Sequence, residues 1–196
     1  MTNSKNKMAT KTIALGAVMT AMVILLQLLG TYTAFFGPFS AALALIPIII
    51  GAAMCGVSVG AWLGLVFSLV VIFTGGANLF LAFNIPGTYI TVLIKGILCG
   101  VASGVVYKLF NKYNDIVATV LASLVCPIVN TGIFLLGSAV FFLDSADAIA
   151  TTIGSEITGM QLFIGMATGN FLFEIGLCIV LSPVVIRLLK IAKKEK

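Results

Sequence analysis

Residues 87–110, GTYITVLIKGILCGVASGVVYKLF, form a long apolar run that carries only two charged residues, Lys95 and Lys108. A helix needs about 20 mostly apolar residues to cross the hydrocarbon core of a membrane. The run therefore predicts a transmembrane helix over residues 87–110. Comparable apolar runs on both sides of it predict five further helices, over residues 11–30, 39–55, 57–74, 115–143 and 160–191.

The composition of the whole chain also indicates a membrane protein. Of its 196 residues, 61% are hydrophobic and 9% are charged, whereas soluble domains carry roughly 25% charged residues. So few charges cannot cover the exterior of a soluble domain of this size, and lipid should surround most of the protein. We therefore expect an all-α membrane protein, a single domain over residues 1–196 that folds as a six-transmembrane-helix bundle.

The positions of the charges predict how the bundle lies in the membrane. Ten of the eleven basic residues lie near the two ends of the chain or in the gap around Lys112, and three of the six acidic residues lie together in residues 144–159. Lysines and arginines concentrate on the cytoplasmic side of membrane proteins. We therefore expect both termini in the cytoplasm and the acidic segment outside. Six spans put both termini on one side, which agrees with this expectation. The net charge of +5 is then a topology signal and not a sign of nucleic-acid binding.

The sequence gives little support to catalytic or metal-binding chemistry. It contains no histidine, which removes the commonest general base and metal ligand. Each of its four cysteines stands alone in an apolar run, so neither a disulfide framework nor a metal cluster is indicated. It also lacks HExxH, GxSxG and Walker motifs. We expect no enzyme activity, no metal and no cofactor, and any use of ATP would require partner subunits.

Small residues recur at helical spacing in three places. Two glycine rows with four-residue spacing begin at Gly56 and at Gly96. Small residues four apart let helices approach closely, so we interpret both rows as packing surfaces inside one bundle. A third small-residue face lies on the first predicted helix, at Ala14, Ala17 and Ala21, near its cytoplasmic end.

Two charged residues, Lys95 and Glu174, lie deep within predicted helices. An unpaired charge at such a depth is costly, so both should face the bundle interior. One interpretation is an ion pair between them that fixes the bundle. Another is that Lys95 binds an anionic group of a ligand while Glu174 accepts hydrogen bonds. A third is that Lys95 extends its ammonium group to the outer surface.

Uncharged polar residues accompany these charges. Asn130 and Thr131 follow a proline within a predicted helix, where the proline frees a backbone carbonyl. Asn170 lies one turn before Glu174, so the two share a helix face. Two more asparagines lie in residues 75–86, which we expect to form a partly buried outer loop. Each could be structural alone, but together they predict a polar pocket that opens outward. The candidate substrate-binding residues are Asn78, Asn84, Lys95, Asn130, Thr131, Asn170 and Glu174.

The order of these features resembles the substrate-binding S component of energy-coupling-factor (ECF) vitamin importers. The shared features are the AxxxA face of the first helix, the glycine- and asparagine-bearing outer loop and a basic C-terminal tail, with Pro-x-x-Asn-Thr at residues 127–131 and Asn-x-x-x-Glu at residues 170–174. The resemblance covers essentially the whole chain and rests on the order of the motifs.

The resemblance implies a high-affinity substrate-binding subunit of an ECF-type ABC importer in a prokaryotic plasma membrane. Its partners would be a small-molecule vitamin, a transmembrane coupling protein and two ATPase subunits. Ala14, Ala17 and Ala21 would form the docking face for the coupling protein. The ligand would lie among the loops 31–38 and 75–86 and the outer halves of the last three helices.

Among such importers, the pantothenate-type members are the most similar. The chain lacks the Asp-bearing stretch after the first helix that is associated with riboflavin binders, and its single tryptophan, Trp62, does not fit the tryptophan-rich pocket of thiamin binders. Riboflavin or another vitamin remains an alternative ligand. An ion-coupled secondary transporter is an alternative function, for which Glu174 is the obvious proton-linked group.

Overall fold

The computed structural model describes residues 2–32, 42–157 and 159–194, and the elements within these ranges are all helical. The expected all-α class is therefore confirmed. The elements are α1 (Thr2–Tyr32), α2 (Ala42–Cys55), α3 (Val57–Phe73), α4 (Asn78–Leu81), α5 (Ile85–Phe110), α6 (Asp115–Phe141), the 3-10 helix η2 (Leu143–Ser145), α7 (Ala146–Ile153) and α8 (Gly159–Lys194).

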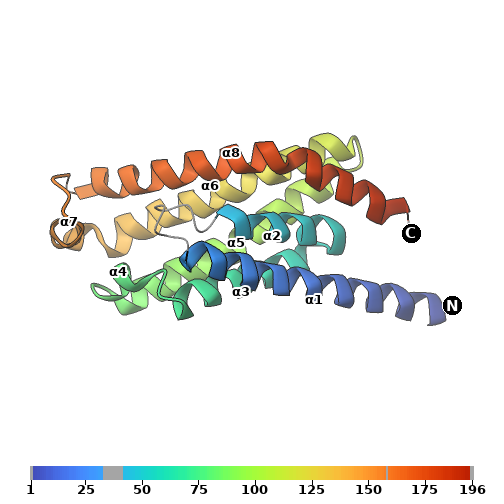
Figure 1. The fold of residues 1–196 in the computed structure, drawn as a ribbon, viewed down its shortest axis with the longest axis horizontal. Coiled ribbons are helices and arrows are strands. Elements are labelled where there is room, and N and C mark those ends of the chain that lie inside the picture. Colours follow the sequence, from blue (N-terminus) through green and yellow to red (C-terminus); the bar gives the residue numbers. More distant parts are fainter. Residues whose placement is uncertain (1, 33–41, 158, 195–196) are drawn as a thin grey trace.

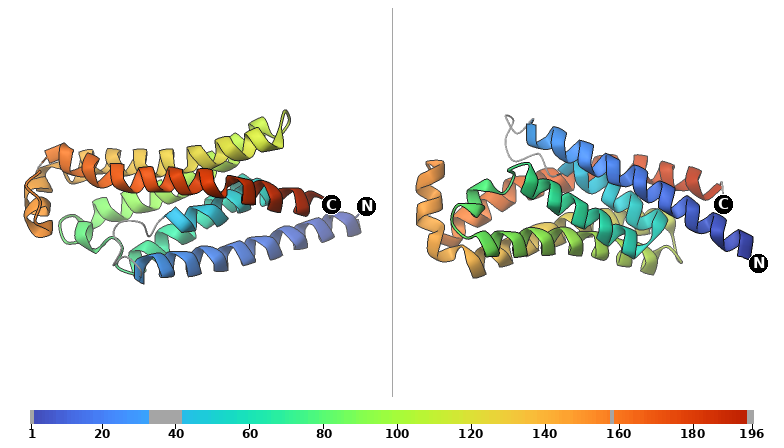
Figure 2. Two further views of the ribbon diagram at one scale, coloured as in Figure 1. Left: turned by 45° about the horizontal axis from the view of Figure 1, so that its top comes forward. Right: turned by 90° about the horizontal axis from the view of Figure 1, so that it is seen from below.

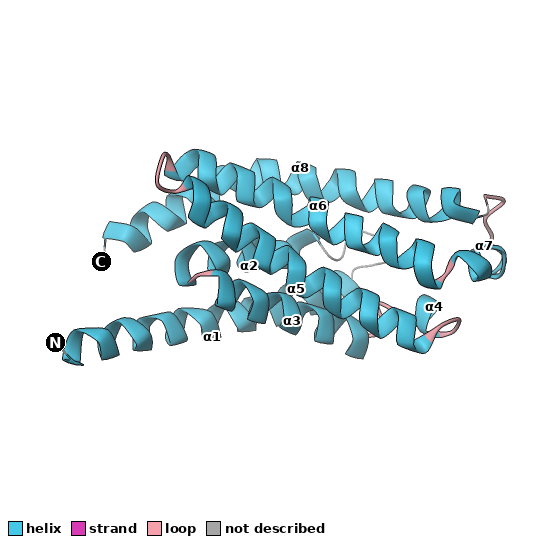
Figure 3. Cartoon of the chain, turned by 180° about the vertical axis from the view of Figure 1, so that it is seen from behind, coloured by secondary structure: helices cyan, strands magenta, loops and turns pink. Residues whose placement is uncertain are grey.

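The long helices lie alongside one another in a single elongated bundle (Figure 1). Both termini lie at one end of this bundle, whereas α4 and α7 lie at the opposite end. The turn between α5 and α6 lies toward the end that holds the termini, as the other views also show (Figure 2, Figure 3). The exposed Lys112 in that turn and the exposed Asp147 on α7 therefore belong to opposite ends of the molecule.

Four helices are long and apolar enough to cross a membrane, over Thr10–Thr31, Ile85–Phe110, Asp115–Phe141 and Gly159–Arg187. The other two apolar helices, α2 and α3, have 14 and 17 residues. At about 1.5 Å per residue they extend roughly 21 and 25 Å, less than the ~30 Å of a hydrocarbon core. The described residues thus contain four helices long enough to span a membrane and two shorter apolar helices, so the expected count of six transmembrane helices stays a prediction.

The glycine rows join α3 to α5. A Cβ atom added to Gly60 would lie 2.6 Å from the carbonyl oxygen of Gly100, and one added to Gly64 would collide with the carbonyl of Gly96. The two backbones therefore approach so closely that no larger residue fits. The interpretation of both rows as internal packing surfaces is confirmed. Gly56, with φ of 100°, forms the tight turn that separates α2 from α3.

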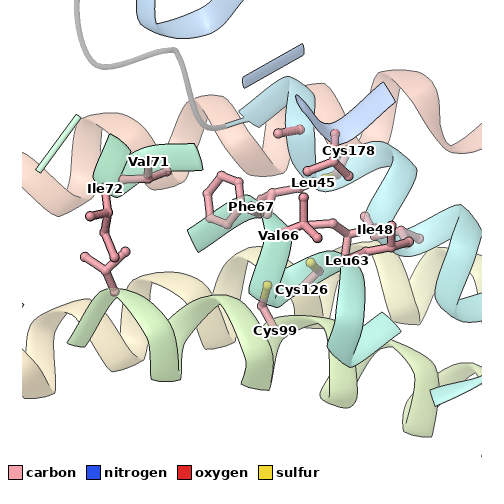
Figure 4. Packing of buried hydrophobic residues seen from close by; sticks show 14 of the residues in the cluster. Leu45, Ile48, Leu63, Val66, Phe67, Val71, Ile72, Cys99, Cys126 and Cys178 are labelled. Atoms are coloured by element: carbon pink, nitrogen blue, oxygen red, sulfur yellow. The ribbon is translucent and has the colours of Figure 1, made fainter. Parts of the chain in front are cut away.

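Apolar side chains from α2, α3, α5, α6 and α8 form the core beside the contact between α3 and α5 (Figure 4). Phe67 and Leu63 of α3 are fully buried there. Cys99, Cys126 and Cys178 reach the same cluster from three different helices as free thiols. These cysteines act as small apolar side chains in the packing of the bundle.

The helix boundaries differ from the expected ones at several points. The first helix begins at Thr2 rather than at residue 11. The expected outer loop, residues 75–86, contains the short helix α4, and α5 begins at Ile85 because Asn84 caps it and proline is tolerated in a first helical turn. The helix α6 continues through Pro127 without interruption. The expected loop 31–38 and the expected start of the second helix at residue 39 fall largely outside the described residues.

Candidate functional site

The beginning of α5 is fixed to the end of α6 by Asn84. Its side-chain oxygen accepts a hydrogen bond from the backbone N–H of Gly87 at 2.9 Å, and its amide nitrogen donates to the carbonyl of Phe141 at 3.1 Å. Both polar groups of the side chain are therefore engaged within the protein. Asn84 shapes the site by holding two helix ends together and is not among the residues that line the cavity beside it.

A cavity of about 60 Å³ lies next to this junction, toward the end of the bundle that holds α4 and α7. Its lining comes from the end of α3, the segment that leads into α4, the first half of α5 and the last part of α6. The lining residues are Val71, Gly76, Ala77, Phe80, Thr88, Thr91, Val92, Lys95, Phe134 and Phe142.

Three polar side chains of α5 line the cavity, and only one of them forms a hydrogen bond within the described residues. Thr88 donates a hydrogen bond to the carbonyl of Asn84 at 2.7 Å. The hydroxyl of Thr91 is buried and has no hydrogen-bond partner among the described residues. Lys95, one turn further along, is partly buried, and its Nζ lies 5.8 Å from the centroid of the Phe134 ring. Among the described residues, the cavity lining therefore includes a threonine whose hydroxyl has no hydrogen-bond partner and a lysine that forms no ion pair.

Aromatic rings form one wall of the cavity. The ring of Phe80 stands edge-on to Phe134, with centroids 5.5 Å apart, and to Phe142, with centroids 5.1 Å apart. Aromatic pairs at this separation and angle are favourable. The wall is therefore a packed apolar surface that faces the polar groups of α5.

A second polar group of residues lies between α6 and α8. Glu174 is fully buried, and its carboxylate accepts hydrogen bonds from the Asn130 amide at 3.1 and 3.4 Å and from the Asn170 amide at 2.7 Å. The side-chain oxygen of Asn130 is buried without a partner in the described residues. The structure thus brings Asn130, Asn170 and Glu174 together, although they come from two helices and a span of 44 residues.

Lys95 and Glu174 do not form the direct ion pair that was one of the expectations. The two charges interact electrostatically, but the hydrogen bonds of the carboxylate all come from asparagine amides within the described part of the chain. The nearest recorded contact of the ammonium group is the ring of Phe134. Glu174 therefore receives its hydrogen bonds from neutral donors, and Lys95 forms no ion pair with an acidic residue in the described part of the chain.

The remaining candidate binding residues lie elsewhere. Asn78 is exposed on α4, and Thr131 is partly buried on α6, and neither lines the cavity. On α1, Ala14, Ala17 and Ala21 are all exposed along the helix surface. The candidate substrate-binding residues, predicted to form one pocket, therefore lie in two separate polar groups, and the predicted docking alanines lie on a different surface.

Sequence reasoning missed Thr91 and the aromatic wall. Threonine and phenylalanine are ordinary residues of membrane helices, so neither is conspicuous in an apolar run. One signal was present, because Thr91 lies four residues before Lys95 and must share its helix face. The phenylalanines could not be assigned, since α4 supplies one ring and the last part of α6 with its C-cap supplies the other two.

Comparison with known proteins gives one match. The model of the protein family described as ECF transporter, substrate-specific component, matches residues 11–186. No curated protein and no solved structure matches the chain. The matched range includes the cavity, the Glu174 group and the exposed alanines of α1.

Proposed function

This chain belongs to the family of substrate-specific components of ECF transporters, and we propose that it is the high-affinity subunit that binds a vitamin or vitamin precursor, with pantothenate as the best candidate. Members of this family are substrate-binding membrane subunits and not enzymes. The proposed location is a prokaryotic plasma membrane. ATP hydrolysis would be carried out by two partner ATPase subunits, which a transmembrane coupling protein connects to this chain.

The charges at the two ends of the bundle support the proposed orientation. Lys108, Lys112 and Arg187 are exposed toward the end that holds the termini, and Asp144 and Asp147 are exposed near α7. Because basic residues favour the cytoplasmic side, the end with α7 would face outward. The proposed protein then spans the membrane six times, with the short helices α2 and α3 as two of the spans.

The observation that carries the proposed function is the cavity beside Lys95. It lies toward the proposed outer end, and it combines an apolar wall with a few polar groups, which is the usual composition of small-molecule sites. A substrate-specific component must take its ligand from the outside. We place the ligand in this cavity, with the Glu174 group beneath it as a second polar surface.

The proposed docking surface for the coupling protein is the exposed face of α1 at Ala14, Ala17 and Ala21. Small side chains allow another membrane helix to approach closely. The opposite side of α1 packs into the bundle through buried residues such as Val23 and Gln27. A partner helix could therefore cover the alanines without disturbing the internal packing of this chain.

Purification from the native membrane tests the proposal. The account predicts that ATPase subunits and a membrane coupling protein copurify with this chain, and that mass spectrometry of the denatured complex identifies one vitamin. A chain that purifies without such partners, and with no small molecule bound, would contradict the proposal.

A further inference from the structure

We infer that the ligand of the cavity carries a carboxylate, which is bound between Nζ of Lys95 and Oγ1 of Thr91, while an apolar part of the ligand contacts Phe80, Phe134 and Phe142. This inference rests on the proposed function, because it concerns the substrate of the same subunit. It extends the class from pantothenate to carboxylates in general, assigns the carboxylate to two side chains and names Thr91 as a residue that determines specificity.

The first argument is the unpartnered hydroxyl of Thr91. This side chain is 5% exposed, and its oxygen has no hydrogen-bond partner in the described residues. Hydroxyl groups of threonine in helices commonly donate to a carbonyl one turn earlier, as Thr88 and Thr119 do at 2.7 Å. Buried polar groups are rarely left unpaired in native proteins. The Thr91 hydroxyl lies beside Gly137 of α6 and lacks a partner in the described residues, on a side chain that also lines the cavity.

The second argument is the charge of Lys95. Its side chain lines the cavity and forms no ion pair among the described residues. Glu174 interacts with it electrostatically, but the hydrogen bonds of that carboxylate come from Asn130 and Asn170. Charged residues at such depth normally pair with an opposite charge or mark a ligand pathway. A ligand carboxylate would supply the missing charge, and Thr91 and Lys95 lie one helical turn apart on α5, on the same face.

The third argument is the shape of the cavity. Its volume of about 60 Å³ is several times the roughly 15 Å³ that one water requires. This space suits a carboxylate with a few attached atoms but not an entire vitamin. The remainder of the ligand would pass the rings of Phe80 and Phe142 toward the α4 and α7 end. A cationic ligand is disfavoured by Lys95, and a neutral one would leave both donors without a charged acceptor.

Binding of matched acids and neutral analogues to the full chain tests this inference. The probes are pantothenate with pantothenol, biotin with biotin amide, and nicotinate with nicotinamide, each measured by calorimetry on the protein in detergent. We expect one of the acids to bind at least about 10-fold more tightly than its neutral analogue, the range given by a hydrogen bond to a charged group.

Two substitutions assign the effect to the named residues. Thr91→Val keeps the volume but removes the hydroxyl, and we expect it to weaken the acid about 10-fold while changing the neutral analogue little. Lys95→Met should also weaken the acid more than the neutral analogue. Thr91→Ser keeps a hydroxyl and should bind the acid as tightly as the unchanged chain. Thr119→Val is the matched control, because Thr119 is equally buried but lies far from the cavity lining and donates to Asp115.

Failure of the inference can be distinguished from failure of the proposed function. Tight binding of a neutral vitamin, equal loss of acid and neutral analogue in Thr91→Val, or no binding of any acid would overturn the inference. If the chain still copurifies with ATPase subunits in that case, the proposed function stands. Absence of those partners would overturn both.

Discussion

Small residues recur at helical spacing in two regions of this protein that have opposite surroundings. Between α3 and α5, Gly60 and Gly64 lie against the backbone carbonyls of Gly100 and Gly96, so that an added methyl group has no room. On α1, the alanines of the proposed docking face are exposed. A small-residue row therefore identifies a surface suited to close helix contact, but only the structure shows whether the chain itself supplies the partner helix.

The largest expected effect is a loss of stability when the glycines buried between α3 and α5, the closed row, are enlarged. Gly64→Ala places a Cβ against the Gly96 carbonyl, so α3 and α5 must separate, and we expect a loss of about 2 kcal/mol or more in stability. Thermal unfolding of the purified protein in detergent measures this loss. The matched control is Gly165→Ala on α8, where a Cβ would meet nothing within 4 Å and where alanine should be neutral or slightly stabilising. Equal effects at the two positions would contradict the distinction between closed and open rows.

Substitutions in the exposed alanine row of α1, the open row, should change transport and not stability. Ala17→Trp adds bulk to an exposed position, so we expect normal ligand binding but at least about a 10-fold loss of ATP-dependent uptake, because the coupling helix cannot approach. Uptake is measured in cells that express the full importer. Ala139→Trp, at an exposed alanine of α6, is the control and should leave uptake unchanged. If Ala17→Trp abolished ligand binding, the assignment of this face to docking would be wrong.

The two buried charged residues, Glu174 and Lys95, should differ in how much their removal costs in stability. Glu174→Leu removes the acceptor of the Asn130 and Asn170 amides, and we expect it to cost about 1–3 kcal/mol because buried donors lose their partner. Lys95→Met should cost less, since Lys95 has no ion pair to lose in the described structure. A double-mutant cycle in thermal unfolding tests this. A coupling between Lys95 and Glu174 as large as that between Asn170 and Glu174 would indicate a direct ion pair.

The smallest expected effect concerns the cap of α5. Asn84→Ala removes hydrogen bonds to Gly87 and Phe141, which should cost about 1 kcal/mol and lower the unfolding temperature by roughly 2–4 °C. The exposed Asn78 on α4 provides the comparison, because Asn78→Ala should change stability by less than about 0.5 kcal/mol. A larger loss at Asn78 than at Asn84 would contradict the structural role assigned to the cap.

Much of the architecture follows from the sequence because long apolar runs identify membrane helices. The apolar runs and the two glycine rows required no tertiary information, and the pairing of Asn170 with Glu174 follows from their spacing on one helix. The contact between Asn130 and Glu174 depends on how α6 packs against α8, so spacing alone cannot give it. The cavity was harder still, since Thr91 and Phe80 are conspicuous only after four segments have come together.

The central claim is that this chain binds the substrate of an importer whose partner subunits hydrolyse ATP to drive transport. Its most direct test is the uptake of radiolabelled pantothenate, or of the vitamin found by mass spectrometry, into proteoliposomes that contain the chain with or without the coupling protein and ATPases. The account predicts binding by the chain alone, and uptake only when the partners and ATP are present. Uptake by the chain alone under a proton or sodium gradient would contradict it.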